Sequence, residues 1–232
     1  MSKLLCTIAA TSCISYDRIT VPRMYAYAKQ CDSDFMAITQ PSFGSVWDAT
    51  NGWEGNPSMW KLPLLRWFAR QHQYSTLAFA DADVFIRKDS PSIFEAAEAN
   101  GGEGFHICRD MNSEREVPLW IQWARERYGL LHDPAPDSFY GNAGVWCVTK
   151  KAAQAMCSSM TLFPEIHTRF LEQDYIQLMA THAGVKRELP IVFNIAYPCQ
   201  IQDPNAGHFL HPCGMCHKDK HEWLERIEAM NI

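Results

Sequence analysis

The segment Thr76–Pro91, with the sequence TLAFADADVFIRKDSP, is an almost unbroken apolar run that ends in two carboxylates. An apolar run without polar alternation is typical of a strand covered on both faces, as in a mostly parallel sheet flanked by helices. Side chains alternate along a strand, so Asp81 and Asp83 are expected on one side and Ala82 on the other. We therefore predict a buried strand that delivers a pair of carboxylates to one site.

Two carboxylates in an apolar setting require a positive partner, because each charge is costly to remove from water. A divalent cation would balance both, and oxygen ligands favour Mg²⁺ or Mn²⁺, which usually complete their coordination with substrate phosphates. A second Asp-x-Asp sequence, Cys31–Asp34, follows a polar helix end and is interpreted as a solvated turn. A turn or helix cap remains the alternative for Asp81 and Asp83. We favour the cation because ligands of open α/β sheets bind at the carboxyl ends of strands.

Composition narrows the class of protein. The chain has 232 residues, 47% of them hydrophobic, which fits one large domain with a sizeable core. A net charge of -5 argues against nucleic acid as the main partner, so a small-molecule or glycan substrate is expected. No apolar run approaches the roughly 20 residues of a spanning helix. Nine irregularly spaced cysteines suggest thiols in a reducing compartment, and a cytoplasmic location is expected.

The pattern of elements predicts an α/β protein. Leu4–Ala10 is predicted to be a strand, Asp17 or Thr20 to cap a helix, and Phe35–Thr39 to form a parallel neighbouring strand. Further elements are expected as a helix from Ser58 with Pro63 in its first turn, a helix capped by Ser92, a strand Phe105–Cys108, a helix Val117–Tyr128 and a strand after Gly141–Gly144. Residues 218–232 are predicted to form an amphipathic helix packed on a domain of residues 1–217, and dimerisation through this helix stays open.

Six short motifs occur in an order that resembles one enzyme family. They are Lys61-Leu62, Leu77–Val84, Asn142–Val145, Glu172–Asp174, Asn194 and His208-Phe209. Together they resemble the retaining glycosyltransferases of the glycogenin and bacterial galactosyltransferase family (glycosyltransferase family 8-like), over most of the chain. The resemblance implies a GT-A fold, a single nucleotide-diphospho-sugar transferase domain with a mixed, mostly parallel sheet. It also implies Mn²⁺ held by the Asp-x-Asp pair and a late histidine.

The resemblance assigns roles to the metal and phosphate residues. Asp81, Asp83 and His208 become the metal ligands. Lys61 becomes the contact to the donor phosphates, with Arg66 as its competitor, because the family places its basic residue about one helical turn nearer the carboxylates. The segment from His208 to Lys218, which includes His211, Gly214 and His217, stands where the family shows His, Gly and Lys-Pro-Trp.

The resemblance also assigns the sugar and nucleotide residues. Asn142 and Ala143 would line the donor sugar pocket, and Gln173 with Asp174 would face the reacting sugar. A structural interpretation of Glu172–Asp174, an exposed helix start, remains open. The nucleotide would contact a first loop to which three residues are assigned, namely Thr7, Thr11 and Tyr16.

The expected function is a metal-dependent transfer of a hexose from a nucleotide diphosphate sugar, a UDP-sugar being favoured, to a hydroxyl of a glycan, protein or small molecule, with retention. The expected cofactor is Mn²⁺, with Mg²⁺ as the second candidate. A cation and a lysine would stabilise the charge that develops on the departing phosphate. One alternative is a metal-dependent phosphoesterase or nucleotidyltransferase. Another is a zinc-binding protein built on Cys213-Gly-Met-Cys216-His217, a sequence that also matches a c-type haem attachment pattern.

Overall fold

The computed structural model describes most of the chain. The described residues are 2–10, 16, 18–40, 56–129, 139–160, 170, 172–196, 203, 205–213, 215 and 217–231.

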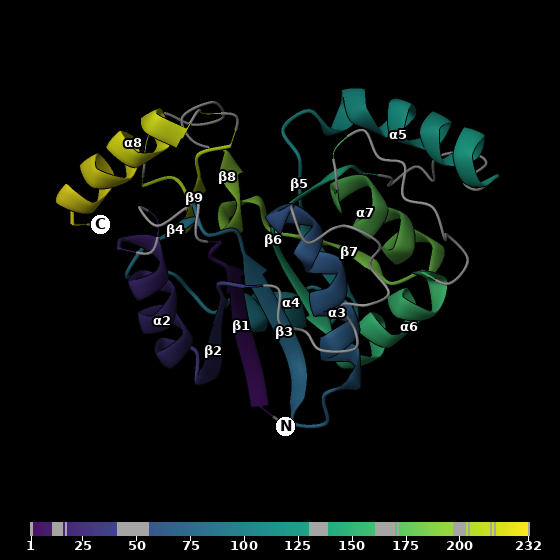
Figure 1. Ribbon diagram of the computed structural model, residues 1–232, viewed down its shortest axis with the longest axis horizontal. Coiled ribbons are helices and arrows are strands. Elements are labelled where there is room, and N and C mark those ends of the chain that lie inside the picture. Colours follow the sequence, from purple (N-terminus) through teal and green to yellow (C-terminus); the bar gives the residue numbers. More distant parts are fainter. Residues whose placement is uncertain are drawn as a thin grey trace.

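The main sheet has six strands in the order β2-β1-β3-β6-β5-β7 (Figure 1). Its strands are β1 (Ser2–Ile8), β2 (Ser33–Ile38), β3 (Tyr74–Ala80), β5 (Phe105–Arg109), β6 (Gly141–Thr149) and β7 (Lys186–Leu189). β1 runs parallel to β2 and β3, and β5 runs parallel to β7. β6 is antiparallel to both β3 and β5. The predicted mixed sheet, with parallel pairs in the majority, is confirmed.

A smaller sheet has the order β4-β9-β8 and consists of β4 (Phe85–Ile86), β9 (Phe209–His211) and β8 (Ile195–Ala196). The helical elements are α2 (Thr20–Gln30), η4 (Pro57–Trp60), α3 (Lys61–Arg70), α4 (Ile93–Ala99), α5 (Ser113–Tyr128), α6 (Lys150–Met160), α7 (Glu172–His182), η5 (Ile191–Phe193) and α8 (His217–Ala229).

Both faces of the main sheet are buried, as the apolar strands predict. Leu77 of β3 packs in a cluster with residues of α3, α6 and α7, whereas its neighbour Ala78 packs in a cluster with residues of α2 and α4. Both side chains are fully buried. Alternation along the strand thus sends successive apolar side chains into two separate cores.

The start of α2 differs from the expected cap. Asp17 lies outside the described residues, and the N-cap position is Ile19, which makes no side-chain cap. Thr20 instead donates its hydroxyl to the carbonyl oxygen of Tyr16 at 2.8 Å and lies against the carbonyl oxygen of Ala82. The threonine therefore ties α2 to the turn that follows β3.

The second Asp-x-Asp sequence is exposed, as predicted. Asp32 lies in a turn with φ 50°, and Asp34 stands exposed at the beginning of β2. Asp81 and Asp83, by contrast, follow the carboxyl end of β3.

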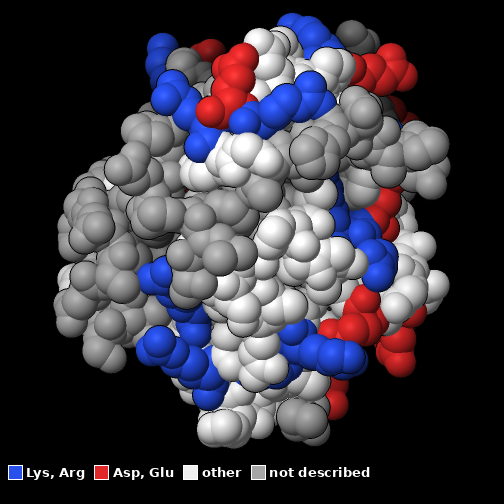
Figure 2. All heavy atoms as spheres, turned by 90° about the vertical axis from the view of Figure 1, so that its right-hand side faces the viewer, with Lys and Arg blue, Asp and Glu red and all other residues white. Residues whose placement is uncertain are grey.

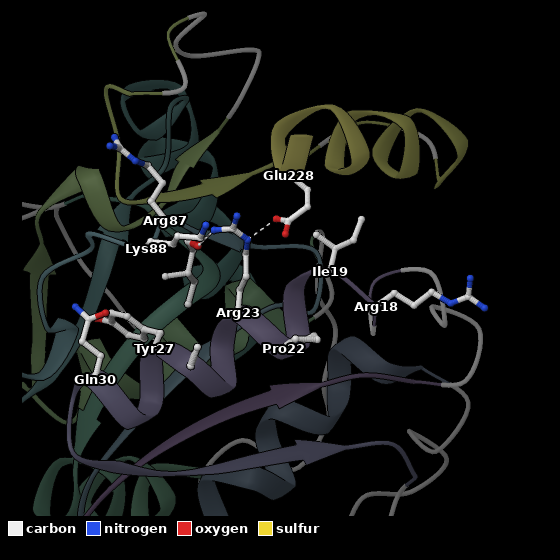
Figure 3. Close-up of a pocket in the computed structure, with 11 residues that line it drawn as sticks. Arg18, Ile19, Pro22, Arg23, Tyr27, Gln30, Arg87, Lys88 and Glu228 are labelled. Atoms are coloured by element: carbon white, nitrogen blue, oxygen red, sulfur yellow. Dashed lines mark hydrogen bonds and ion pairs between the residues drawn. The ribbon is translucent and has the colours of Figure 1, made fainter. Parts of the chain in front are cut away.

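The C-terminal helix α8 packs on the small sheet. Its buried side chains Trp223, Leu224 and Ile227 share a cluster with Phe85 of β4. Met230 lies beyond α8 and is 57% exposed. Near the end of α8, Glu228 accepts a charged hydrogen bond from Arg23 of α2 at 2.5 Å (Figure 3). α8 is thereby fixed to α2 as well as to the small sheet.

The surface around α5 and α6 carries both signs of charge. Acidic and basic side chains are interspersed on this side of the molecule, a pattern that suits a solvated face (Figure 2). None of the described helices combines the length and apolar character needed to span a bilayer. The six cysteines in the described ranges are free thiols, namely Cys6, Cys31, Cys108, Cys147, Cys157 and Cys213.

A lysine on β7 is enclosed by aromatic rings. Lys186 Nζ lies 5.0 Å from the ring centre of Trp120 and 4.4 Å from that of Phe139. It donates hydrogen bonds to the Phe139 carbonyl oxygen at 2.6 Å and to Gln177 Oε1 at 2.9 Å. Burial, together with the charge of Arg109, lowers the pKa of Lys186 to about 7, although Glu188 opposes the shift.

Lys186→Met is expected to change how stability depends on pH. An unfolded lysine has a pKa near 10.4, so between about pH 7 and pH 10 the unfolded wild-type chain binds more protons than the folded one. Wild-type stability should therefore rise with pH relative to the Lys186→Met variant, by roughly 2–3 kcal/mol over that range. Urea unfolding at both ends of the range measures the difference. The exposed Lys151→Met serves as control, and parallel pH profiles for wild type and Lys186→Met would contradict the assignment.

Candidate metal centre and substrate pocket

The two carboxylates lie in a tight turn immediately after β3. The Asp81 amide donates to the Gly144 carbonyl oxygen at 2.7 Å, and the Val84 amide donates to the Asp81 carbonyl oxygen at 2.9 Å. Asp83 is buried at 8% exposure, while Asp81 is half-buried. The turn thus holds both carboxylates at one end of the main sheet, as the sequence predicted.

A histidine from the small sheet completes this group. His211 ends β9, and its Nε2 lies 3.4 Å from Asp83 Oδ1 and 3.9 Å from Asp81 Oδ2. One ligand atom from each of the three side chains lies within 4.8 Å of the other two. Two carboxylate oxygens and one imidazole nitrogen suit Mn²⁺ or a similar divalent ion. The residues present therefore fit a divalent cation.

His208, the predicted third ligand, is not part of this group. Its ring packs on Phe193 with 5.8 Å between ring centres, and its backbone accepts hydrogen bonds from Arg87 and Ser90. His208 lies at a bend of the chain before β9, whereas His211 is the last residue of that strand. The structure therefore places His211 beside the two carboxylates, whereas the predicted ligand His208 stands apart from them.

The His211 ring is oriented by a chain of polar contacts. Nδ1 lies 3.0 Å from Asn194 Oδ1, an acceptor, which leaves Nε2 directed at the carboxylates. Asn194 Nδ2 donates to Asn142 Oδ1 at 2.9 Å, and Asn142 Nδ2 donates to Asp110 Oδ2 at 3.2 Å. Ligating histidines commonly have such a partner on the other ring nitrogen.

Gly144 provides the space for the His211 ring. A Cβ atom at this position would lie 2.2 Å from His211 Cε1 and 2.5 Å from Nδ1, which no side chain tolerates.

Burial lowers the pKa of His211, but the Asp83 carboxylate and Cys213 outweigh it, so the pKa lies well above its ordinary value. The Asp83 carboxylate therefore favours the protonated form of the His211 ring.

Lys61, the predicted phosphate contact, binds other groups of the protein in this structure. Its Nζ lies 2.9 Å from Asp81 Oδ1, 2.7 Å from Glu172 Oε1 and 3.1 Å from the Ala143 carbonyl oxygen. Burial lowers the pKa of Lys61, but Asp81 and Glu172 outweigh it and raise the pKa above its ordinary value. An ammonium has three donors, and these contacts use all three. In this structure Lys61 orients Asp81 and has no proton left for a phosphate.

Arg66, the competing candidate, lies on another side of α3. Burial raises the pKa of Cys157 on α6 to about 11, and the nearby charges of Arg66 and Arg70 oppose that rise. Arg66 therefore lies near α6, and it does not line the pocket that contains the carboxylates. Neither Lys61 nor Arg66 lines that pocket, and the phosphate contact stays a prediction.

A different basic residue reaches the carboxylates. Lys220, in the first turn of α8, places Nζ 2.5 Å from Asp83 Oδ2, with 16% of its side chain exposed. Lys218, two residues earlier, has a side chain that is 81% exposed and lies 3.9 Å from Glu222. Lys220 stands three and four residues before Trp223 and Leu224, on the apolar stripe of the helix, whereas Lys218 lies off that stripe, so helical periodicity distinguishes the two lysines.

The start of α7 is buried rather than exposed. Asp174 has no exposed surface and accepts hydrogen bonds from the Tyr140 hydroxyl at 2.6 Å and the Phe170 amide at 3.2 Å. In this conformation protein groups enclose the Asp174 carboxylate, and its role toward the sugar stays a prediction. Gln173 is half-buried and accepts from the Ala143 amide at 2.9 Å, and its amide nitrogen has no partner in the described ranges.

The remaining residues predicted to contact the donor differ in how far they are buried. Asn142 is half-buried and belongs to the polar chain that leads to His211, whereas Ala143 is 1% exposed and contacts Gln173 and Lys61 through its backbone. Thr7 is fully buried with an unpartnered hydroxyl, and Thr11 lies outside the described residues.

A pocket of about 290 Å³ opens over the carboxylates. It is lined by Ile8, Tyr16, Pro57, Ser58, Asp81, Ala82, Asp83, His211, Cys213 and Lys220. Of the predicted nucleotide residues, Tyr16 therefore lies at the pocket. The pocket combines apolar walls with carboxylates, an imidazole and an ammonium, a composition that suits an organic ligand with an anionic group.

One signal in the sequence points to His211. It directly follows the apolar pair Phe209-Leu210, which is fully buried, just as Asp81 follows the apolar run of β3. A polar group at the end of a buried strand was the criterion that found the carboxylates, and it applies equally to this histidine.

Comparison with known proteins places the fold. No protein-family model matches the sequence, and no curated protein matches it significantly. The galactosyltransferase LgtC, solved with donor and acceptor sugar analogues, is 15% identical and superposes with a TM-score of 0.61, covering 98% of this chain and 95% of that one. A glycosyltransferase involved in glycosylation of the major capsid of PBCV-1 is 15% identical with a TM-score of 0.58, covering 97% of this chain and 100% of that one.

A third similar structure is the apo form of the bifunctional glycosyltransferase WbbM. It is 12% identical with a TM-score of 0.64, and the match covers 96% of this chain and 49% of that one. Sequence identities this low carry the likeness of the backbone alone, but that likeness extends over nearly the whole chain. The mixed sheet, the carboxylates after β3 and these superpositions together show that the chain has the GT-A fold of the glycosyltransferases.

Proposed function

We propose that this protein is a metal-dependent glycosyltransferase that moves a hexose from a nucleotide diphosphate sugar, a UDP-sugar in the first instance, to a hydroxyl acceptor with retention. The observation that carries the proposal is the group Asp81, Asp83 and His211, which lines a pocket in a GT-A fold. The similar LgtC structure contains donor and acceptor sugar analogues, which supports the same classes of substrate here.

The described side chains have distinct tasks in this proposal. Asp81, Asp83 and His211 would hold the cation, whose chemistry is to stabilise negative charge on the departing diphosphate. Lys61 fixes the orientation of Asp81, and Asn194 fixes that of His211. Rigid support of this kind keeps the ligands in place without reorganisation during the reaction.

Gln173 is the proposed group closest to the reacting sugar. Its carbonyl is anchored on the Ala143 amide, which leaves its amide NH₂ able to donate to a sugar oxygen or to orient the acceptor hydroxyl. The buried carboxylate of Asp174 supports this helix start through Tyr140.

The proposed cation is Mn²⁺ in preference to Mg²⁺. An imidazole nitrogen in the ligand set favours a transition ion, whereas Mg²⁺ prefers oxygen ligands alone. Activity measured with each ion at equal concentration should be higher with Mn²⁺.

A donor screen tests the proposed function directly. The purified protein is incubated with Mn²⁺, a panel of nucleotide sugars and a panel of hydroxyl acceptors, and the products are separated by mass. Sugar attached to an acceptor, together with free nucleoside diphosphate, is the expected result. Release of sugar phosphate or inorganic phosphate would instead identify a phosphoesterase or nucleotidyltransferase. The outcome that contradicts the proposal is absence of transfer across the panel with every ion tried.

A further inference from the structure

The two carboxylates divide their oxygens between lysines and the histidine. Asp81 Oδ1 lies 2.9 Å from Lys61, and Asp83 Oδ2 lies 2.5 Å from Lys220. The other two oxygens, Asp81 Oδ2 and Asp83 Oδ1, face His211 Nε2 at 3.9 and 3.4 Å. A cation can therefore bind the inner oxygens and the imidazole while both lysines keep their outer oxygens.

This division has an electrostatic consequence. Lys220 already balances the charge of Asp83 before any cation arrives. A divalent ion that enters beside a retained ammonium meets like charge at short range, which weakens its binding. A donor diphosphate supplies the missing negative charge, and the Lys220 ammonium then has phosphate oxygens as well as Asp83 within reach. The cation and the diphosphate should consequently favour each other's binding.

We propose that Lys220 is a positioning residue that makes cation binding at Asp81, Asp83 and His211 conditional on a nucleoside diphosphate. The proposal rests on the proposed function, because it uses the same metal site. It goes further in assigning the coupling between the two ligands to one side chain of the C-terminal helix.

The placement of α8 keeps Lys220 at the site. Trp223 and Leu224, in the middle of the helix, are buried against the small sheet, and near the C-terminal end Glu228 pairs with Arg23. The helix is therefore held at several points, and Lys220 can exchange partners by rotation of its own side chain. Lys218 on the same helix turns to solvent, which makes it a matched control.

The test measures Mn²⁺ binding without any turnover. Mn²⁺ alone is titrated into wild type, Lys220→Met and Lys218→Met, and free Mn²⁺ is followed by electron paramagnetic resonance. Lys220→Met keeps an unbranched apolar stem but removes the charge, so it should bind Mn²⁺ roughly tenfold more tightly than wild type. Lys218→Met should match wild type. Lys220→Arg, which retains the charge, should also remain close to wild type.

The same titrations are repeated with saturating uridine diphosphate. In wild type the nucleotide should raise Mn²⁺ affinity strongly, and in Lys220→Met this enhancement should fall by roughly tenfold. Thermal unfolding of each variant verifies that the chain is folded. Equal Mn²⁺ affinity of Lys220→Met and wild type without nucleotide would overturn the proposal, as would an unchanged enhancement by uridine diphosphate.

These outcomes are separate from those of the donor screen. Titrations that show the expected differences between wild type and Lys220→Met, combined with no sugar transfer, would contradict the proposed function and leave the role of Lys220 supported. Sugar transfer combined with identical titrations for wild type and Lys220→Met would do the reverse.

Discussion

His211→Ala is expected to lower Mn²⁺ affinity by at least roughly a hundredfold and to remove cation-dependent activity, whereas His208→Ala should behave as wild type in both respects. Loss of a supporting contact around a metal commonly costs 10–100-fold in affinity, and loss of a ligand should cost no less. His211 Nε2 faces both carboxylates, while the His208 ring packs on Phe193. Mn²⁺ titration by electron paramagnetic resonance, with and without nucleoside diphosphate, provides the measurement.

The pair of variants distinguishes the two histidines. Both are close in sequence, so a general effect on the small sheet should appear in both thermal unfolding curves. Loss of the Mn²⁺ response in His208→Ala with a normal response in His211→Ala would show that the ligand assignment drawn from the structure is wrong.

Asp83→Asn should reduce activity by a factor of roughly a thousand or more while the fold is retained. An amide keeps the shape of the side chain but loses the charge, and both the cation and Lys220 depend on that charge. Burial raises the pKa of Asp83, but the neighbouring His211 and Lys220 outweigh it and hold the pKa well below its usual range. The carboxylate is therefore stabilised in the folded chain.

The stability of the Asp83→Asn variant should fall slightly. Removing the charge leaves Lys220 without its partner, at a cost of about 1–2 kcal/mol, which corresponds to a decrease of a few degrees in the unfolding temperature for a chain of this size. Asp32→Asn, in the exposed second Asp-x-Asp sequence, is the control and should change neither activity nor stability. Full turnover by Asp83→Asn in the presence of a chelator would exclude a metal at this position.

Local patterns in the sequence were sufficient for the sheet and for the carboxylates. The uninterrupted apolar run before Asp81 predicted a strand buried on both faces, and Leu77 and Ala78 do lie in two separate cores. Asp81 and Asp83 directly follow this strand and are neighbours in sequence, so their relative position depends on a single turn.

Contacts between distant segments were not predictable in the same way. The choice between His208 and His211 depends on which face of β9 meets the turn after β3, and that is fixed by packing of the small sheet. Likewise, helical periodicity placed Lys61 and Arg66 on one helix, but it could not show that the Lys61 ammonium donates a hydrogen bond to Glu172. Lys220 lies on the apolar stripe of the predicted helix, but only the packing of α8 shows that this stripe brings its ammonium to Asp83.

The small sheet that carries His211 consists of very short strands, of two residues in β4 and three in β9. A cation shared by His211 and the carboxylates after β3 would join this sheet to the main one, acting as a reversible cross-link between segments distant in sequence. An ion that binds only when these segments are together adds its binding free energy to the free energy needed to separate the two sheets. The ion would thus stabilise the position of His211 in the pocket wall, in addition to its part in the reaction.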